Sequence, residues 1–390
     1  MDQRAKLAGA NAGQRLLFID NLRWSMILLV ISMHAADTYS PLGNWYFTDR
    51  TQLAVPTLLV FAAWQMYLQS FFMGLLFFVA GFFVPASFDR KGPGRFLRDR
   101  AYRLGLPVVF YMFVLGPVTE YYVAHSWNST KPTSMVNEWM KHIRNGQFLQ
   151  ENGPLWFCLA LLIFCFAYAA IRSLRPKPAA AQAHATNPEP LRQNTIIGFA
   201  LILGAATFLV RALRAPTILN MHLGDFPQYI LLFCAGIFAA RRGFLWSLKR
   251  KAAMRWLLTL PVSFAVWLAI LVEGGALQPN GRASFAGWHW QAAAICFWEA
   301  FACVAISLIL LVLFRDTFDS QGSVAKFLSD NAFSVYVFHP PIVIMGARLL
   351  RVVTWYPLEK FVVLWAVAAT VTFALSAAVF RRVPLLRAML

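Results

Sequence analysis

Charged residues are scarce in this sequence, and those of negative sign are the scarcest. Only 13% of the 390 residues are charged, with 17 Asp and Glu against 35 Lys and Arg, while 59% are hydrophobic and the mean hydropathy is +0.56. A soluble globular domain carries about twice this share of charge. The composition therefore excludes an ordinary soluble protein and favours a chain that spends most of its length in a membrane.

Motifs for metal binding and for disulfide pairing are also missing. The five cysteines all lie in apolar runs without a CxxC pair, and no two histidines stand at the spacing of metal ligands. A metal site or a disulfide framework would need such patterns. We therefore expect no metal and no tightly bound cofactor. No internal repeat is visible either, although many transporters are built from matched halves.

What the sequence does contain is a series of apolar runs, each close to the length that crosses a bilayer as a helix. They predict an all-α, polytopic membrane bundle of about ten helices in which residues 1–390 form a single domain. A run that begins at Leu53 leaves room for an interfacial turn before the second span. The predicted spans are residues 16–36, 59–84, 104–122, 155–171, 195–210, 230–240, 257–272, 292–314, 333–350 and 361–380.

Basic residues gather between these runs. Most of the 35 Lys and Arg fall in every second connection, with clusters at residues 90–103 and 241–255. Loops rich in Lys and Arg stay in the cytoplasm, so both termini are predicted there, in the inner membrane of a bacterium. The net charge of +18 then reports membrane orientation, and we expect a lipid bilayer and no nucleic acid as partner. Residues 173–194, rich in Pro and Ala, predict a flexible cytoplasmic linker.

The first apolar run has an alternative interpretation as a secretory signal, because Arg15 and Arg23 precede an apolar stretch that ends in small residues. Cleavage there would leave the cluster at residues 90–103 on the predicted side only if the next span inserted with its own orientation. We therefore favour a retained first span.

Arg23 and His34 are ionisable residues in that first span, where burial is expensive and often serves function. Arg23 and His34 are 11 residues apart, which is within about 20° of three whole turns and about 16.5 Å along a helix axis. They share one helix face and could hold the two ends of an extended ligand. The alternative is a snorkelling anchor at Arg23 and a packing residue at His34. Asp37, one turn later, could orient the imidazole, and such a pair can act as a general base on an alcohol.

A second polar group precedes the third predicted span. Arg100 and Arg103, at i,i+3, would face the same way at the start of a helix and could bind phosphate oxygens. The rule that cytoplasmic loops are basic explains the same two residues without a ligand. Glu299 in the eighth span and His339 in the ninth are further polar candidates, and either could equally be an interhelical hydrogen bond.

In the order and spacing of these motifs the sequence resembles the membrane-bound acyltransferase family 3. The opening LLFIDNLRWSMILLVISMHA is similar to the family's aromatic-Ile-Asp-x-x-Arg signature, in which the Arg begins an Arg-x10-His pattern matched by Arg23 and His34. Many members have Ser where this chain has Ala80, so that serine is not expected as a nucleophile here. The other matches are Arg100 and Arg103 for Arg-x-x-Arg, FFVAGFF for FFxxGF, Trp156 and Phe157 for Trp-Phe, and Tyr336, His339 and Pro341 for Tyr-x-x-His-x-Pro.

The resemblance implies transfer of an acyl group, usually acetyl, from cytoplasmic acyl-CoA to a hydroxyl of a glycan or another acceptor. It implies that Arg23, Arg100 and Arg103 meet the CoA phosphates. His34 would then deprotonate the acceptor hydroxyl, with Asp37 or another carboxylate holding its tautomer. The chain is also similar in length to periplasmic glucan succinyltransferases, so the co-substrate is expected to be acetyl-CoA or succinyl-CoA.

The acceptor side is less defined by sequence. We expect Trp156, Glu299 and His339 to contact the substrate. Aromatic residues of the outer loops could stack on sugar rings, and they could equally be ordinary interfacial anchors. Two other classes of function stay open, a proton-coupled transporter of small anions or sugars and a structural partner in an envelope complex. The aromatic residues in question are Trp45, Tyr46, Tyr121, Tyr122, Trp127 and Trp139.

Overall fold

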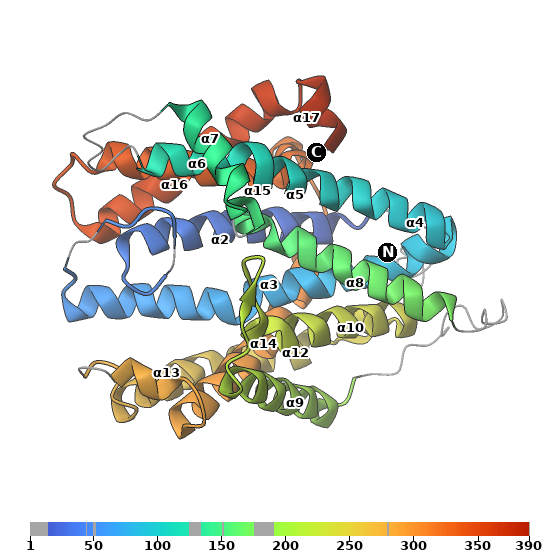
Figure 1. Cartoon of the computed structure of the whole chain (residues 1–390). Coiled ribbons are helices and arrows are strands. Elements are labelled where there is room, and N and C mark those ends of the chain that lie inside the picture. Colours follow the sequence, from blue (N-terminus) through green and yellow to red (C-terminus); the bar gives the residue numbers. More distant parts are fainter. Residues whose placement is uncertain are drawn as a thin grey trace.

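The computed structural model describes residues 15–43, 45–49, 52–124, 134–149, 152–174, 191–278 and 281–389. In this part of the chain ten helical spans are long and apolar enough to cross a membrane, so the predicted all-α fold and the predicted count are confirmed. The spans lie side by side as one bundle, along the horizontal direction of Figure 1. The protein is therefore a multi-pass membrane protein.

Five of the spans are single α-helices and five join shorter elements end to end. The single helices are α2 (Leu17–Tyr39), α3 (Val55–Lys91), α9 (Gln193–Ala212), α14 (Trp290–Thr317) and α15 (Ser323–Leu350). The joined spans are α4 (Pro93–Arg100) to α6 (Gly116–Ala124), η4 (Gly153–Leu155) with α8 (Trp156–Ser173), η6 (Leu223–Asp225) with α10 (Phe226–Arg242), α12 (Arg250–Leu257) with α13 (Thr259–Glu273), and α16 (Pro357–Leu375) with η8 (Ser376–Phe380).

Most spans extend beyond the predicted boundaries. α3 is one continuous helix of 37 residues, so the interfacial turn expected before the second span is wrong. The sixth span covers Leu223–Arg242 and not only residues 230–240. Hydropathy detects the part of a helix that lies in hydrocarbon, whereas polar ends continue the same helix into the headgroup region, where backbone hydrogen bonds still favour it.

The centre of the bundle consists of α2, α3, α14 and α15, the four spans with the largest buried shares. α10 packs directly on α3 through two glycines. A Cβ at Gly81 would overlap the carbonyl of Phe233, and a Cβ at Gly236 would overlap the carbonyl of Phe78. Small residues at such crossings let membrane helices approach to backbone distance and maximise van der Waals contact.

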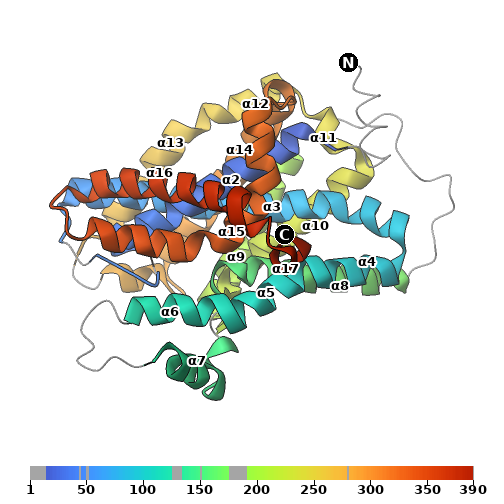
Figure 2. The same ribbon diagram turned by 90° about the horizontal axis from the view of Figure 1, so that it is seen from above.

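The two ends of the bundle differ in character. The beginnings of α2 and α4 lie toward the right in Figure 1, and we call this the basic end, because Arg15 lies just before α2 and three arginines lie in α4. Connections on the other side of the spans carry α7 (Met135–Arg144) and a hairpin of β1 (Thr217–Ile218) and β2 (Met221–His222), and the hairpin lies near the middle of the view in Figure 1. Figure 2 shows α7 on the flank of the bundle, beside α6. Most of the predicted linker, residues 175–190, lies outside the described residues.

Candidate active site

His34 lies on α2 beside side chains from three segments of the chain. Its Nδ1 is 3.3 Å from Oδ2 of Asp37, as the i,i+3 spacing predicts. Its ring stacks on Trp45 with centroids 3.8 Å apart, and the ring of His339 from α15 lies at 5.3 Å and nearly parallel. The side chain stays 20% exposed. Because Nδ1 faces the carboxylate, Nε2 is the ring nitrogen left for a substrate.

Asp37 is held from the other side by α3. Gln65 Nε2 donates to Asp37 Oδ1 at 2.6 Å, and both residues are buried. Gly43 packs so closely that a Cβ there would overlap the carboxylate. A fixed carboxylate at Nδ1 selects the tautomer with the proton on Nδ1, which leaves the Nε2 lone pair as a base. Gln65 was missed by sequence reasoning, because its only signal is one polar residue within an apolar run.

His339 is fully buried, and the prolines that follow it explain its orientation. Pro340 has no N–H, so the carbonyl of Tyr336 loses its partner in the helix. The Nδ1 of His339 donates to that carbonyl at 2.8 Å and replaces the missing bond. Its Nε2 is buried and has no hydrogen-bond partner among the described residues. The structure thus brings His339 close to His34. The Nε2 atom of His339 keeps a lone pair that accepts no hydrogen bond from the described residues.

Arg23 lies on the same helix as His34, toward the basic end. Its guanidinium is 3.5 Å from Asp20 and its Cζ is 5.0 Å from the ring of Phe83, with 43% of the side chain exposed. Arg100 is close enough for its charge to act on Arg23. The structure therefore brings together two of the three arginines expected to meet phosphate, one from α2 and one from α4.

The expected helix N-terminus at Arg100 and Arg103 is wrong. The helix begins at Pro93, so both residues lie beyond the first turn, where the dipole has little effect. Residues Ala101–Gly105 form the π-helical segment η1, so the α-helical spacing that would align the two side chains does not apply. Arg103 is exposed and Arg100 is partly buried.

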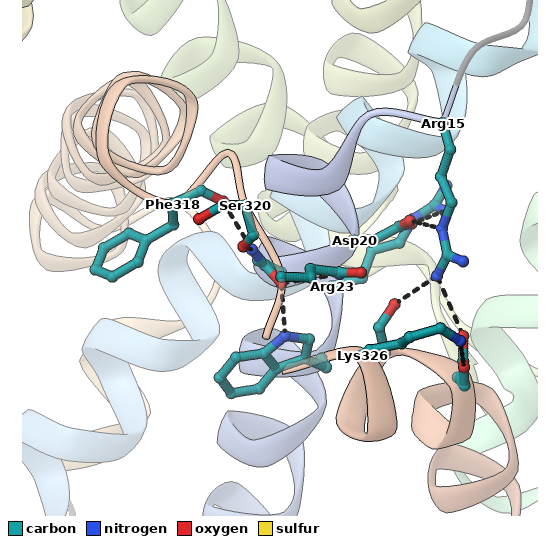
Figure 3. A network of polar contacts seen from close by, with 11 residues as sticks. Arg15, Asp20, Arg23, Phe318, Ser320 and Lys326 are labelled. Atoms are coloured by element: carbon teal, nitrogen blue, oxygen red, sulfur yellow. Dashed lines mark hydrogen bonds and ion pairs between the residues drawn. The ribbon is translucent and has the colours of Figure 1, made fainter. Parts of the chain in front are cut away.

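The segment before Arg23 fastens α2 to α15 at the basic end. Asp20 pairs with both Arg15 and Arg23, and Arg15 reaches Asp330 of α15 at 3.3 Å (Figure 3). The hydrogen bond to Asp20 is the main cause that raises the pKa of Arg15. Asp20 is thus one acceptor shared by two arginines, and it holds Arg23 in place.

Asn21 fastens α2 to the connection between α14 and α15. Its Nδ2 donates to the carbonyls of Phe318 at 2.7 Å and Ser320 at 2.9 Å (Figure 3). Its Oδ1 accepts from Trp24 and Gln321. All four hydrogen-bonding positions of this buried amide are filled, which explains an Asn in a helix interior.

Two residues expected at the substrate, Trp156 and Glu299, pack on other side chains. Trp156 packs on Tyr229, with ring centroids 5.4 Å apart, at the start of α8. Glu299 of α14 pairs with Arg211 at 2.7 Å, and Arg211 also binds Asp225 at 2.7 Å. Among the described residues, the ring contacts and ion pair of His34 are with Asp37, Trp45 and His339. The substrate role of Trp156 and Glu299 stays a prediction. The ion pair of Glu299 with Arg211 could not be predicted from the sequence around Glu299, because Arg211 lies on another helix.

No group of three or more His, Cys, Asp or Glu that could hold a metal is found in the described part of the chain. All five cysteines are free thiols there.

Comparison with known protein families matches residues 16–381 to the acyltransferase domain Acyl_transf_3. This match extends from the residue before α2 to the end of the tenth span, so it covers the whole bundle. The curated proteins and the solved structures compared with the chain yielded no match. The chain belongs to the acyltransferase family 3, as the motifs predicted.

Proposed function

We propose that this acyltransferase moves an acyl group from acyl-CoA to a hydroxyl of a glycan of the cell envelope, with His34 as general base. The observation that carries the proposal is the chain of contacts from Gln65 through Asp37 to His34. It orients an imidazole whose Nδ1 faces the carboxylate and whose Nε2 is left for the acceptor, in a partly exposed position, three turns along one helix from Arg23. Family membership supports the reaction class, and the arrangement supports the roles.

In the proposed reaction Nε2 of His34 takes the proton of the acceptor hydroxyl as its oxygen attacks the thioester carbonyl. The tetrahedral intermediate collapses with loss of the CoA thiolate, which takes the proton back from the imidazolium. The products are an ester and free CoA. Asp37 stabilises the imidazolium while it exists, as the carboxylate does in serine hydrolase triads.

The donor is proposed to enter at the basic end. Guanidinium groups bind phosphate oxygens in a forked geometry, so Arg23 and Arg100 suit the phosphates of CoA, with Arg103 exposed beside them. An extended pantetheine arm would then lie along α2 toward His34. We propose acetyl-CoA as the donor, with succinyl-CoA as the alternative, and the inner membrane of a bacterium as the location, with the basic end in the cytoplasm.

The test is release of CoA thiol by the purified protein in detergent, with acetyl-CoA and succinyl-CoA offered in turn and a glycan acceptor present. We expect His34→Ala to abolish release and Arg100→Ala to raise the KM for the donor. His222→Ala on β2 and Arg255→Ala on α12, both exposed, are matched controls and should behave as wild type. If folded wild type neither binds nor cleaves either donor, the proposed function is wrong, and uptake of labelled anions or sugars into vesicles becomes the next measurement.

A further inference from the structure

A polar pocket of about 340 Å³ lies between α6, α7 and the loop that follows α2, at the end of the bundle opposite the basic end. This volume is at the lower end for ligand sites, roughly 300–1,000 Å³, so it suits one or two small rings. Among the residues that line it are Tyr46, Glu120, Tyr121, Lys141, His142 and Gln147.

A carbonyl exposed by proline docks α7 against the third span. Pro117 has no N–H, so the carbonyl of Phe113 lacks its helical partner. Trp139 of α7 donates its indole Nε1–H to that carbonyl at 2.6 Å. The α7 wall of the pocket is therefore attached through a backbone carbonyl, that of Phe113, which has no hydrogen-bond donor at position 117 of its own helix.

A π-helical turn supplies the second attachment. In η2 (Tyr111–Leu115) the N–H of Gly116 donates to the carbonyl of Tyr111, which deprives Met112 of its usual helical donor. His142 of α7 lies with Nε2 at 3.3 Å from the Met112 carbonyl and Nδ1 at 2.9 Å from Glu120. This histidine is buried, so the pocket wall is a built structure and not a loose loop.

α7 also carries apolar side chains that are partly exposed. The polar residues of the same helix line the pocket on the other side. A short helix with this division lies in the membrane interface with its apolar side in lipid. A pocket with such a helix as its wall is expected to open at the membrane surface. The exposed apolar residues are Met135, Val136, Trp139 and Met140.

The pocket adjoins the proposed base through two consecutive residues. Tyr46 lines the pocket, and its hydroxyl is 3.2 Å from that of Tyr111. Trp45 meets the Tyr46 ring edge-on at 5.1 Å and stacks on His34 at 3.8 Å. Two aromatic side chains, Tyr46 and Trp45, thus connect the pocket to the His34 cluster.

The chemistry of the walls selects the ligand class. Two carboxylates, Glu120 and Glu138, face Lys141 and His142, so the pocket holds acidic and basic groups together. Two tyrosine rings add flat surfaces. Mixed donors and acceptors with aromatic faces suit an uncharged ring rich in hydroxyl groups, and they disfavour a polyanion.

We propose that this pocket is the acceptor subsite and holds a neutral sugar ring of the glycan, so that a hydroxyl on the adjoining part of the acceptor reaches His34. The inference rests on the proposed function, which it deepens by assigning the acceptor to a place distinct from the CoA site.

The test fills the pocket and compares two acceptors. Gln147→Trp places an indole in the pocket, and Asn145→Trp, on the same connection but outside the lining, is the matched control. With acetyl-CoA as donor we expect Gln147→Trp to raise the KM for a neutral glucan oligosaccharide at least tenfold, while transfer to glycerol and the KM for acetyl-CoA are unchanged. Asn145→Trp should equal wild type in all three.

A second, smaller substitution tests the same pocket in case the indole introduced by Gln147→Trp disturbs folding. Tyr121→Ala removes one stacking surface and should raise the oligosaccharide KM by roughly two- to tenfold with the glycerol rate kept. Unchanged oligosaccharide KM in both folded variants, or an equal loss with glycerol, overturns the subsite. If wild type acylates neither acceptor, the proposed function has failed instead, which these arms distinguish.

Discussion

At the scale of single residues, Gln65 holds the carboxylate that orients His34. Gln65→Ala removes a hydrogen bond to a charged group, a type of bond that contributes about 1.5–3 kcal/mol. If Asp37 loses its fixed position, His34 spends less time in the productive tautomer, and kcat should fall by roughly 10- to 100-fold. The KM for acyl-CoA should not change, because Arg23 and Arg100 are remote. Steady-state kinetics of the folded variant measures the split, and a rise in KM without loss of kcat would contradict this role.

His339 is expected to behave differently from His34 because it also completes its own helix. His339→Ala leaves the buried Tyr336 carbonyl without its donor, a loss of about 1–3 kcal/mol in the free energy of unfolding. His34→Ala removes a longer contact of 3.3 Å to Asp37, and that carboxylate keeps its hydrogen bond from Gln65. Thermal unfolding in detergent should therefore show a lower Tm for His339→Ala than for His34→Ala, with both variants impaired in turnover. Equal Tm values for the two would refute the structural role given to His339.

Residue-level chemistry was predictable only where the partners share a helix. His34 and Asp37 are three residues apart, so helical geometry brings them together whatever the fold. Gln65 reaches the same carboxylate from another helix, and Arg211 reaches Glu299 likewise. Such pairs depend on how helices pack, which no local spacing encodes.

At the scale of elements, the glycines between α3 and α10 allow close packing. Gly81→Ala places a methyl group against the backbone carbonyl of Phe233, so the helices must separate, at an expected loss of about 1–3 kcal/mol. Gly198→Ala in α9 is the matched control, because a Cβ there meets nothing within 4 Å. Chemical unfolding in mixed micelles should show the loss for Gly81→Ala alone. Equal stability of both variants would mean that the crossing tolerates a wider spacing.

The attachment of α7 offers a second test at this scale. Trp139→Phe keeps the ring and deletes the donor to the Phe113 carbonyl, which contributes about 0.5–1.5 kcal/mol. Hydrogen exchange of residues 135–144 should then accelerate by roughly two- to tenfold, since local opening controls that rate. Exchange elsewhere should be unaffected, and the oligosaccharide KM should rise. Unchanged exchange in this segment would show that the bond does not hold α7.

Element boundaries were less predictable than element number. Pro107 and Pro117 are visible in the sequence, but whether they break, kink or rewind a helix depends on what satisfies the freed carbonyls. Here the chain continues through π-helical segments because neighbours such as Trp139 donate to them. Hydropathy counts apolar residues and contains no information on whether a helix continues with α-helical or π-helical hydrogen bonds.

At the scale of the whole molecule, the proposed reaction requires that donor and acceptor approach from opposite sides. The arginines for phosphate lie at the basic end and the acceptor pocket lies at the other. The count of ten spans was predictable because each must cross the same hydrocarbon thickness, and an even count places both ends of the chain on one side. The order in which the spans pack was not predictable. An apolar helix face can contact lipid tails or another helix equally well, so hydrophobicity does not select its neighbour.

Orientation is the last prediction, and the reaction depends on it. Basic connections are retained in the cytoplasm, so a fluorescent protein fused after Arg387 should fold and fluoresce, while alkaline phosphatase fused after Gln147 should be active outside. The exchanged pair, phosphatase after Arg387 and fluorescent protein after Gln147, should both be inactive. The reverse result would place Arg23 and Arg100 on the side without acyl-CoA. Thioester cleavage by the purified protein could then survive, but donor and acceptor would have exchanged sides, and the path along α2 from the basic end to His34 would have to be abandoned.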